Sequence, residues 1–186
     1  MKVELKPYED ALTWRNKLAR LAWGMAWATL FRPFGGPLFK RWRVFLLRRF
    51  GATIGAHCAV AASVRVWAPW NLTLGDYVAI GPGATLYSVD RIVVGSMATI
   101  SQRAHLCTAS HDVTRLLKPL IHRPIALGNY TWVAAEAFVG MGVTVGEGAV
   151  IGARAVVAKD VPPWMIAVGN PAKAIKRRTL AEGGRP

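Results

Sequence analysis

Aliphatic residues recur every six positions over most of the chain. Ile, Val or Leu occupies fifteen such positions, namely 54, 60, 66, 74, 80, 86, 94, 100, 106, 127, 133, 139, 145, 151 and 157. Glycine follows eight of these residues, and the residue two places earlier is small or apolar. Because side chains alternate between the two faces of a strand, this pattern predicts a short strand and a turn in each hexad.

The period is interrupted three times, and each interruption follows three hexads. Two extra residues lie between positions 66 and 74, two between 86 and 94, and fifteen between 106 and 127. Three hexads therefore form one coil, and three strands per coil predict a triangular prism whose interruptions share one corner. Successive coils would stack about 4.8 Å apart with the aliphatic side chains inside. We expect a mainly β protein, a parallel β-helix of about five coils.

The first fifty residues follow a different pattern. Trp14 to Phe31 is rich in Leu, Ala and Trp and predicts a helix, which the Pro- and Gly-rich stretch 33–37 ends. Leu38 to Phe50 predicts a second, basic helix. These helices would cover the open end of the β-helix, and they could also hold the protein at an anionic membrane surface.

The expected organisation therefore has three parts. They are a helical cap at 1–50, a β-helix at 51–160 with a protruding loop at 107–124, and a C-terminal extension at 161–186.

The charge is uneven along the chain. Of the formal net charge of +14, residues 1–50 carry +8, residues 51–172 carry +2 and residues 173–186 carry +4. Such basicity first suggests a nucleic-acid or membrane-surface protein, but no nucleic-acid-binding motif is present. Because 53% of the residues are apolar and 18% are charged, a disordered protein is excluded.

Cysteine usage and the N-terminal segment bear on the compartment. Cys58 and Cys107 are too few for a disulfide framework and lack metal-ligand spacing, so no metal site is expected. The polar first ten residues do not resemble a secretory signal. The apolar run from Leu21 to Phe31 has eleven residues, whereas a spanning helix needs about 20. We expect a cytoplasmic protein whose membrane contact is at most peripheral.

Five stretches carry a resemblance to a known family. They are residues 101–102 with 106–112 (Ser-Gln and Leu-Cys-Thr-Ala-Ser-His-Asp), 142–146 (Gly-Val-Thr-Val-Gly), 150–153 (Val-Ile-Gly-Ala), 159–163 (Lys-Asp-Val-Pro-Pro) and 169–173 (Gly-Asn-Pro-Ala-Lys). Together with the hexads, over roughly residues 43–178, they resemble the hexapeptide-repeat O-acetyltransferases, closest to the colanic acid biosynthesis and galactoside–maltose types. The resemblance implies a left-handed β-helix and a homotrimer with active sites between subunits. It also implies transfer of an acetyl group from acetyl-CoA to a saccharide hydroxyl in exopolysaccharide or cell-surface glycan synthesis.

His111 lies in the fifteen-residue interruption. Its segment matches the one that carries the family's catalytic histidine. A neutral imidazole, with an ordinary pKa of about 6.5, could take the proton from the sugar hydroxyl as that oxygen attacks the thioester. No acyl-enzyme is then required, so neither cysteine is expected to act as a nucleophile.

Four other residues are candidate contacts to the acceptor. Asn71 and Asp90 lie in the two earlier interruptions at the same corner, so stacking would bring them near the path to His111; alternatively, they only satisfy backbone groups of the turns. Asp112 could orient His111 or a substrate hydroxyl, or simply cap the loop. Trp132 would point out of the prism, where it lies either in a trimer contact or, as the resemblance suggests, in the wall of the acceptor site.

The resemblance places the donor in a groove between two subunits, toward the C-terminal coils. At Ala135, where the family often has serine, a backbone N–H could stabilise the oxyanion. The other matching positions are Ala153 and Ala158 for backbone contacts and Lys159, Lys173, Lys176 and Arg177 for the phosphates. The basic C-terminal cluster could instead be a solvated tail.

Two other functions stay open at this point. A γ-type carbonic anhydrase shares the β-helix but needs three histidines on one metal ion. Since His105 and His111 are six residues apart, they would lie on adjacent faces of the prism. A non-catalytic basic scaffold would use the charged ends of the chain for binding. The zinc content of the purified protein tests the first alternative, and turnover of acetyl-CoA distinguishes an acetyltransferase from the second.

Overall fold

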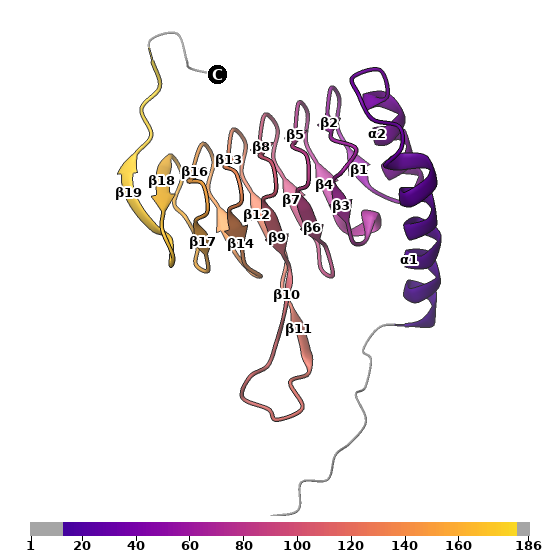
Figure 1. Cartoon of the computed structure of the whole chain (residues 1–186). Coiled ribbons are helices and arrows are strands. Elements are labelled where there is room, and N and C mark those ends of the chain that lie inside the picture. The colour runs from indigo at the N-terminus through magenta and orange to yellow at the C-terminus, as the bar shows by residue number, and fades with distance from the viewer. Residues whose placement is uncertain (1–12, 182–186) are drawn as a thin grey trace, which may run out of the picture.

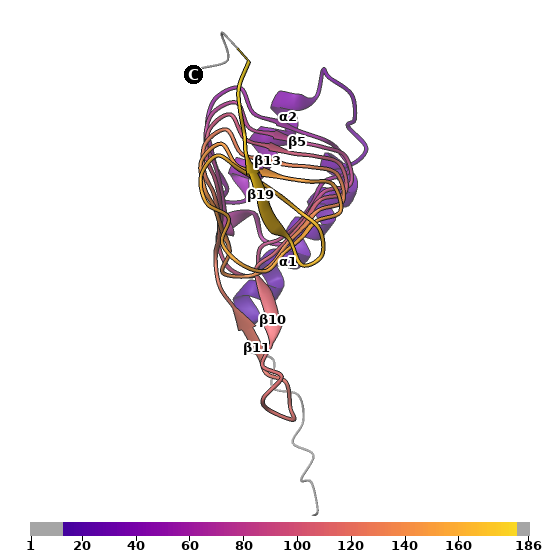
Figure 2. The ribbon, with the colours of Figure 1, turned by 90° about the vertical axis from the view of Figure 1, so that its left-hand side faces the viewer.

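The computed structural model describes residues 13–181, which form a stack of parallel β-coils closed at one end by two helices (Figure 1). Along the axis of the stack, a hairpin leaves one corner and β19 (Lys173–Arg177) lies across the C-terminal end (Figure 2). Residues 1–12 and 182–186 lie outside the described residues. They include the polar N-terminal stretch, the start of the predicted cap and the end of the predicted C-terminal extension.

Successive coils contribute one short strand to each of three parallel sheets, which we name faces A, B and C. Face A contains β1 (Thr53–Ile54), β4 (Leu72–Leu74), β7 (Ile92–Val94), β12 (Ile125–Leu127) and β15 (Thr144–Val145). Face B contains β2 (Ala59–Val60), β5 (Ala79–Ile80), β8 (Thr99–Ile100), β13 (Trp132–Val133), β16 (Val150–Ile151) and β18 (Met165–Val168), with β19 antiparallel at its edge. Face C contains β3 (Arg65–Val66), β6 (Thr85–Tyr87), β9 (His105–Cys107), β14 (Phe138–Val139) and β17 (Val156–Val157).

The hexad aliphatics stack on their equivalents in the next coil and fill the interior. On face A, for example, Ile54 pairs with Leu74, which in turn pairs with Val94. All fifteen predicted core positions are at most 7% exposed. Burying each such side chain contributes about 1.5–3 kcal/mol. The predicted parallel β-helix is confirmed, with five complete coils and a partial sixth, in which β18 follows β16 and Val161 bridges to Val145.

All three interruptions fall at the corner between faces C and A, as the sequence predicts. The first forms the 3-10 turn η2 (Pro69–Asn71), the second spans residues 88–91, and the third forms the hairpin of β10 (Ala109–His111) and β11 (Leu120–His122). One corner of the prism therefore carries nearly all the irregular backbone of the coils, and the hairpin projects from it (Figure 1).

The first coil exposes backbone carbonyls that later coils do not. In each later coil the carbonyl of a hexad aliphatic accepts an N–H from the preceding coil, as Ile80 O does from Ala61 N at 2.9 Å. The first coil has no coil before it, so the carbonyls of Ile54, Val60 and Val66 lack this donor. A buried carbonyl without a partner costs about 1–3 kcal/mol.

The two N-terminal helices, α1 (Trp14–Ala26) and α2 (Lys40–Arg49), supply one side-chain donor to each face. The three bonds, for faces A, B and C in turn, are Arg48 Nη2 to Ile54 O (2.6 Å), Arg43 Nε to Val60 O (2.7 Å) and Trp23 Nε1 to Val66 O (2.7 Å). Beneath them, Phe31 of the π-helical turn η1 (Trp27–Phe31) and Leu47 of α2 are fully buried. Aromatic and basic side chains of this region therefore close the first coil of the β-helix.

The corner between faces A and B requires a left-handed backbone at equivalent positions of the coils. Residues with positive φ stack there, namely His57, Tyr77, Met97, Tyr130, Gly148 and Trp164. At Gly148 there is no room for a side chain, because a Cβ would lie 2.5 Å from the Trp164 ring. Glycine meets both the left-handed φ of +65° and the close approach.

Candidate functional site

The hairpin of β10 and β11 is anchored at its root to the preceding coil. Thr108, which is fully buried, donates its hydroxyl to Tyr87 O at 2.8 Å, and its carbonyl accepts Arg123 N at 2.9 Å. Beyond this root the two strands pair in register, with Ala109 opposite His122 and His111 opposite Leu120. The fifteen-residue interruption thus presents His111 outside the prism on a short ribbon.

His111 is exposed, and one of its ring nitrogens is held by the loop. His111 Nδ1 lies 2.6 Å from Lys118 O. Because a carbonyl oxygen can only accept, this contact assigns the proton to Nδ1 of the neutral ring and leaves the lone pair of Nε2 free. The imidazole is therefore oriented and is ready to accept a proton at Nε2.

Asp90 ties the ribbon to the coil that lies closer to α1. Its Oδ2 is 2.7 Å from His122 Nδ1, its Oδ1 accepts Arg91 N at 2.7 Å, and its own N–H donates to Thr108 Oγ1. Partial burial raises the pKa of Asp90, but the hydrogen bonds and positive charges of His122 and Arg91 outweigh this effect, so the pKa is lowered. Since His122 and His111 share one face of the ribbon, that face is turned toward the N-terminal coils.

Asn71 acts on the same corner from one coil earlier. Its Nδ2 donates to Ser88 O at 3.0 Å and to Val89 O at 2.9 Å. Asn71, Asp90 and the root of the hairpin are thereby joined by consecutive hydrogen bonds, which is the proximity that stacking of the interruptions predicts. The two bonds that Asn71 donates go to backbone carbonyls of the turn, as expected for a residue that satisfies backbone groups there.

Asp112 bonds within its own loop. Its Oδ1 accepts from Thr114 N at 3.0 Å and from Thr114 Oγ1 at 2.6 Å, and its Oδ2 lies 3.5 Å from Arg115 Nε. The two hydrogen bonds from Thr114 lower the pKa of this carboxyl. These contacts are those of a loop-capping carboxylate.

Trp132 stands on a different side of the prism from His111. It points outward from face B, is 46% exposed, and donates Nε1 to Ser101 Oγ at 2.9 Å. The hairpin leaves the opposite corner, between faces C and A. One chain therefore does not bring Trp132 and His111 together.

The positions predicted to bind the donor lie in three places. Ala135 and Ala153 stack at the corner between faces B and C, where Arg154 N donates to Ala135 O at 2.9 Å. The exposed pair Ala158 and Lys159 follows β17, on the way from face C to face A. The three basic residues are exposed on β19, at the C-terminal edge of face B: Lys173, Lys176 and Arg177.

Three contacts at the site are not predicted from the sequence. They are the carbonyl of Lys118 on His111, the partnership of His122 with Asp90, and the hydroxyl of Ser101 on Trp132. Each depends on the register of the hairpin or of neighbouring coils. For the His122–Asp90 contact, the sequence shows only that His122 lies near the end of the fifteen-residue interruption. Within residues 13–181, no three His, Cys, Asp or Glu side chains lie close enough to hold a metal ion.

The fold is that of a hexapeptide-repeat β-helix protein. The β10–β11 hairpin with His111, which we call the histidine ribbon, leaves one corner, and basic residues lie at the C-terminal edge. No family model matches the chain. It is 41% identical over 167 residues to the colanic acid biosynthesis acetyltransferase WcaF of Escherichia coli K12, with 90% of this chain and 91% of that protein covered. It is 28% identical over 137 residues to the galactoside O-acetyltransferase of the same strain, covering 72% of this chain and 68% of that enzyme.

A similar solved structure is the hexapeptide-repeat acetyltransferase VCA0836 of Vibrio cholerae O1 biovar eltor, complexed with acetyl-CoA. It has a TM-score of 0.82 at 22% identity and covers 91% of this chain and 92% of its own. This likeness shows the fold, and the identity to WcaF over nine-tenths of both chains shows the family. The chain belongs to the hexapeptide-repeat acetyltransferases.

Proposed function

We propose that this protein transfers an acetyl group from acetyl-CoA to a saccharide hydroxyl in the synthesis of an exopolysaccharide or cell-surface glycan, with His111 as general base. The observation that carries the proposal is the contact of His111 Nδ1 with Lys118 O, which leaves Nε2 unprotonated in the neutral ring. The identity to WcaF supports the reaction and the saccharide class.

The donor supplies a thioester carbonyl that an alcohol can attack. His111 Nε2 accepts the proton that the acceptor hydroxyl loses as its oxygen bonds to the acetyl carbon. When the carbon–sulfur bond breaks, the same nitrogen returns this proton to the departing thiolate. The histidine ends in its starting state, so the chain needs no covalent intermediate.

A homotrimer accounts for the separation of the candidate residues. In one chain, Trp132, Ala135, Ala153 and β19 border face B, whereas His111, Ala158 and Lys159 lie at the corner between faces C and A. If face B of one subunit meets that corner of the next, the two sets line one groove. The small side chains at Ala135 and Ala153 leave backbone accessible to the donor, and Lys159, Lys173, Lys176 and Arg177 would meet its phosphates.

On the acceptor side, Asn71, Asp90 and Asp112 surround the base of the ribbon or its loop. We propose that Asp90, which keeps its negative charge because its pKa is lowered, accepts a hydrogen bond from a sugar hydroxyl. Asn71 holds the turn that positions it, through Ser88 and Val89.

The outer face of α1 supports a peripheral contact with an anionic membrane. Trp14, Leu18, Leu21 and Met25 lie along it, and each is more than half exposed. Residues 13–50 contain nine Lys or Arg and no Asp or Glu. Apolar and basic side chains on one helical segment suit the headgroup region of anionic lipids. Within the part of the chain that is described, no helix is long and apolar enough to span a membrane.

Vesicle binding tests this contact. Wild-type protein should sediment with phosphatidylglycerol vesicles, and Leu18→Glu with Leu21→Glu should abolish sedimentation. Binding to phosphatidylcholine vesicles alone, or no effect of the double substitution, would contradict the proposal.

Coenzyme A release from acetyl-CoA, measured with a panel of saccharide acceptors and confirmed by mass spectrometry of the products, tests the reaction. His111→Ala should lower kcat by at least about 100-fold, the usual contribution of a general base. His57→Ala is the matched control, because His57 is an exposed histidine that stacks on Tyr77 at another corner. Full activity of His111→Ala, or no acetyl transfer by the wild type to any acceptor, would refute the proposed function.

A further inference from the structure

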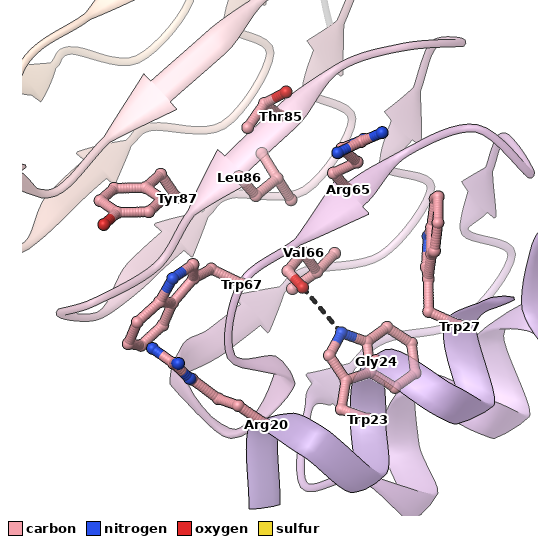
Figure 3. Close-up of a pocket in the computed structure, with 10 residues that line it drawn as sticks. All are labelled: Arg20, Trp23, Gly24, Trp27, Arg65, Val66, Trp67, Thr85, Leu86 and Tyr87. Carbon is pink, nitrogen blue, oxygen red and sulfur yellow. Dashed lines mark hydrogen bonds between the residues drawn. The ribbon is translucent and has the colours of Figure 1, made fainter. Parts of the chain in front are cut away.

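A pocket of about 410 Å³ lies between α1 and the outer surface of face C (Figure 3). Arg20 and Trp27 line it from the helical side, and Arg65, Trp67 and Tyr87 line it from β3, the turn after β3, and β6. Trp23, which bonds to Val66 O, lines it from α1. Its volume lies in the range of small-molecule sites.

The lining is aromatic and positive. Arg20 Cζ lies 4.1 Å from the centroid of the Trp67 ring, and Arg65 Cζ lies 5.4 Å from that of Trp27. No carboxylate lines the pocket, and among the described residues none lies within 4 Å of either guanidinium. Stacking on an indole orients a guanidinium while its N–H groups stay free for an anion. The two guanidinium groups lie on opposite sides of the pocket (Figure 3), and each can donate to phosphate oxygens.

The aromatic rings add a surface for a sugar. The rings of Trp67 and Tyr87 meet edge to face, with centroids 5.6 Å apart and planes at 67°. The C–H face of a pyranose is apolar and packs against such rings, while its hydroxyls stay accessible. The pocket therefore combines a surface for a saccharide with two cations for phosphate.

The pocket adjoins the histidine ribbon. Tyr87 pairs with Cys107, and its carbonyl accepts the N–H and the hydroxyl of Thr108 at the root of the hairpin. His111 lies four positions after Cys107, about 13 Å of extended chain. The ribbon face that carries His111 is turned toward the N-terminal coils, the side on which α1 stands (Figure 1). A saccharide seated on Tyr87 would thus extend toward His111.

We propose that this pocket binds the phosphate group that links the acceptor saccharide to its carrier. Arg20, beside Trp67, and Arg65, on the opposite side of the pocket, each donate to oxygens of the phosphate linkage, and Trp67 and Tyr87 pack against the sugar. In naming the ligand as the acceptor, this inference rests on the proposed function. Phosphate-linked sugars occur on nucleotides and on polyprenyl lipids, and the two sources share this chemistry.

Calorimetric titration of the full chain with UDP and with farnesyl diphosphate tests the pocket and separates the two sources. Saturating coenzyme A is present throughout, so that the donor's own phosphate contacts are filled. At least one probe should bind, and Arg20→Gln and Arg65→Gln should each weaken its affinity at least tenfold. The control is Arg41→Gln, because Arg41 is an exposed arginine of α2 outside the pocket. Binding of UDP alone assigns a nucleotide carrier, binding of farnesyl diphosphate alone assigns a lipid carrier, and binding of both supports the shared diphosphate. Binding of neither probe, or binding that Arg20→Gln and Arg65→Gln leave unchanged, overturns the proposal.

The His111→Ala variant separates this inference from the proposed function. It should bind the probe as the wild type does, because His111 does not line the pocket. If binding depends on Arg20 and Arg65 but no acceptor is acetylated, the proposed function fails and the phosphate site stands. If acetyl transfer proceeds with the same kcat/KM for free and phosphate-linked sugars, in the wild type and in Arg20→Gln alike, the phosphate site fails and the function stands.

Discussion

Arg43 is a buried cation whose partners are all carbonyl groups, and its replacement by methionine tests how the cap stabilises the β-helix. The side chain is 3% exposed. Its Nε donates to Val60 O at 2.7 Å, its Nη1 to Phe34 O at 2.6 Å, and both Nη atoms to Gly36 O at 3.2–3.3 Å. Burial lowers the pKa of this guanidinium.

The expected loss follows from what each carbonyl can do without the arginine. Val60 is 1% exposed, so its carbonyl is left without a partner at a cost of about 1–3 kcal/mol. Phe34 and Gly36 are exposed, and their carbonyls recover most of the lost bond from water. Methionine fills similar volume and removes a desolvated charge, which offsets part of the cost. We expect Arg43→Met to lower the free energy of unfolding by about 2 kcal/mol.

Urea unfolding followed by circular dichroism, at one protein concentration, measures this loss. Arg41→Met changes an exposed arginine of the same helix and should shift the free energy of unfolding by less than about 0.5 kcal/mol. Arg43→Lys keeps the charge but lacks the planar fork that reaches several carbonyls, so it should also be destabilised. A loss below about 0.5 kcal/mol for Arg43→Met, or wild-type stability for Arg43→Lys, would refute the hydrogen-bonding role.

Three further predictions concern the ribbon, the interior and a corner. His122→Gln should lower kcat several-fold with little change in KM, because His122 ties the His111 ribbon to Asp90. Since the folded pKa of Asp90 is lowered, the Asp90–His122 pair stabilises the protein fully above the ordinary aspartate pKa of about 4 and loses this effect as the pH falls through the folded value. The difference in unfolding free energy between wild type and His122→Gln, measured with urea, should therefore shrink as the pH is lowered below about 4. A difference that stays equal to that at pH 7 down to the lowest pH at which the wild type is folded would contradict the pairing. Leu106→Ala, at a position with no exposure in a central coil, should cost about 2–5 kcal/mol in urea unfolding, whereas Leu116→Ala in the exposed loop should cost little. Gly148→Ala should cost about 1–3 kcal/mol because of its positive φ and the Trp164 ring, whereas Gly24→Ala in α1, with nothing within 4 Å, should be neutral or stabilising by thermal unfolding.

The fold could be predicted because each coil repeats the same three short strands and turns. Every strand on each of the three faces needs an aliphatic residue that points inward, so fifteen positions of the sequence all indicate the same β-helix. The three interruptions identify the corner that they share. The donors that close the first coil could not be predicted in this way. Arg43, Arg48 and Trp23 donate side-chain hydrogen bonds to Val60, Ile54 and Val66, and nothing in the sequence period links these pairs.

The candidate site could be predicted only where it follows from the same stacking. Asn71 and Asp90 lie together because they occupy equivalent corners in successive coils. The hairpin has no equivalent in another coil, so its register, and with it the contact of His111 with Lys118 O, depends on the folded loop. The relation of Trp132 to His111 could not be predicted in the same way. Its place on face B follows from its hexad position, but one chain does not bring it to His111, and only the proposed homotrimer would.

The basic residues of the N-terminal region divide according to what they contact. Arg43 and Arg48 donate to carbonyls of the first coil, whereas Arg20 lines the pocket and stacks on Trp67. Closure of the β-helix and formation of the pocket share residues as well, because Trp23 both donates to Val66 O and lines the pocket. A cap that only closed the stack would need donors for the carbonyls of the first coil and no further cations. Among residues 13–181 no carboxylate pairs with the guanidinium of Arg20, which lies over an indole beside the ribbon that carries His111. A ligand therefore explains this side chain better than folding does.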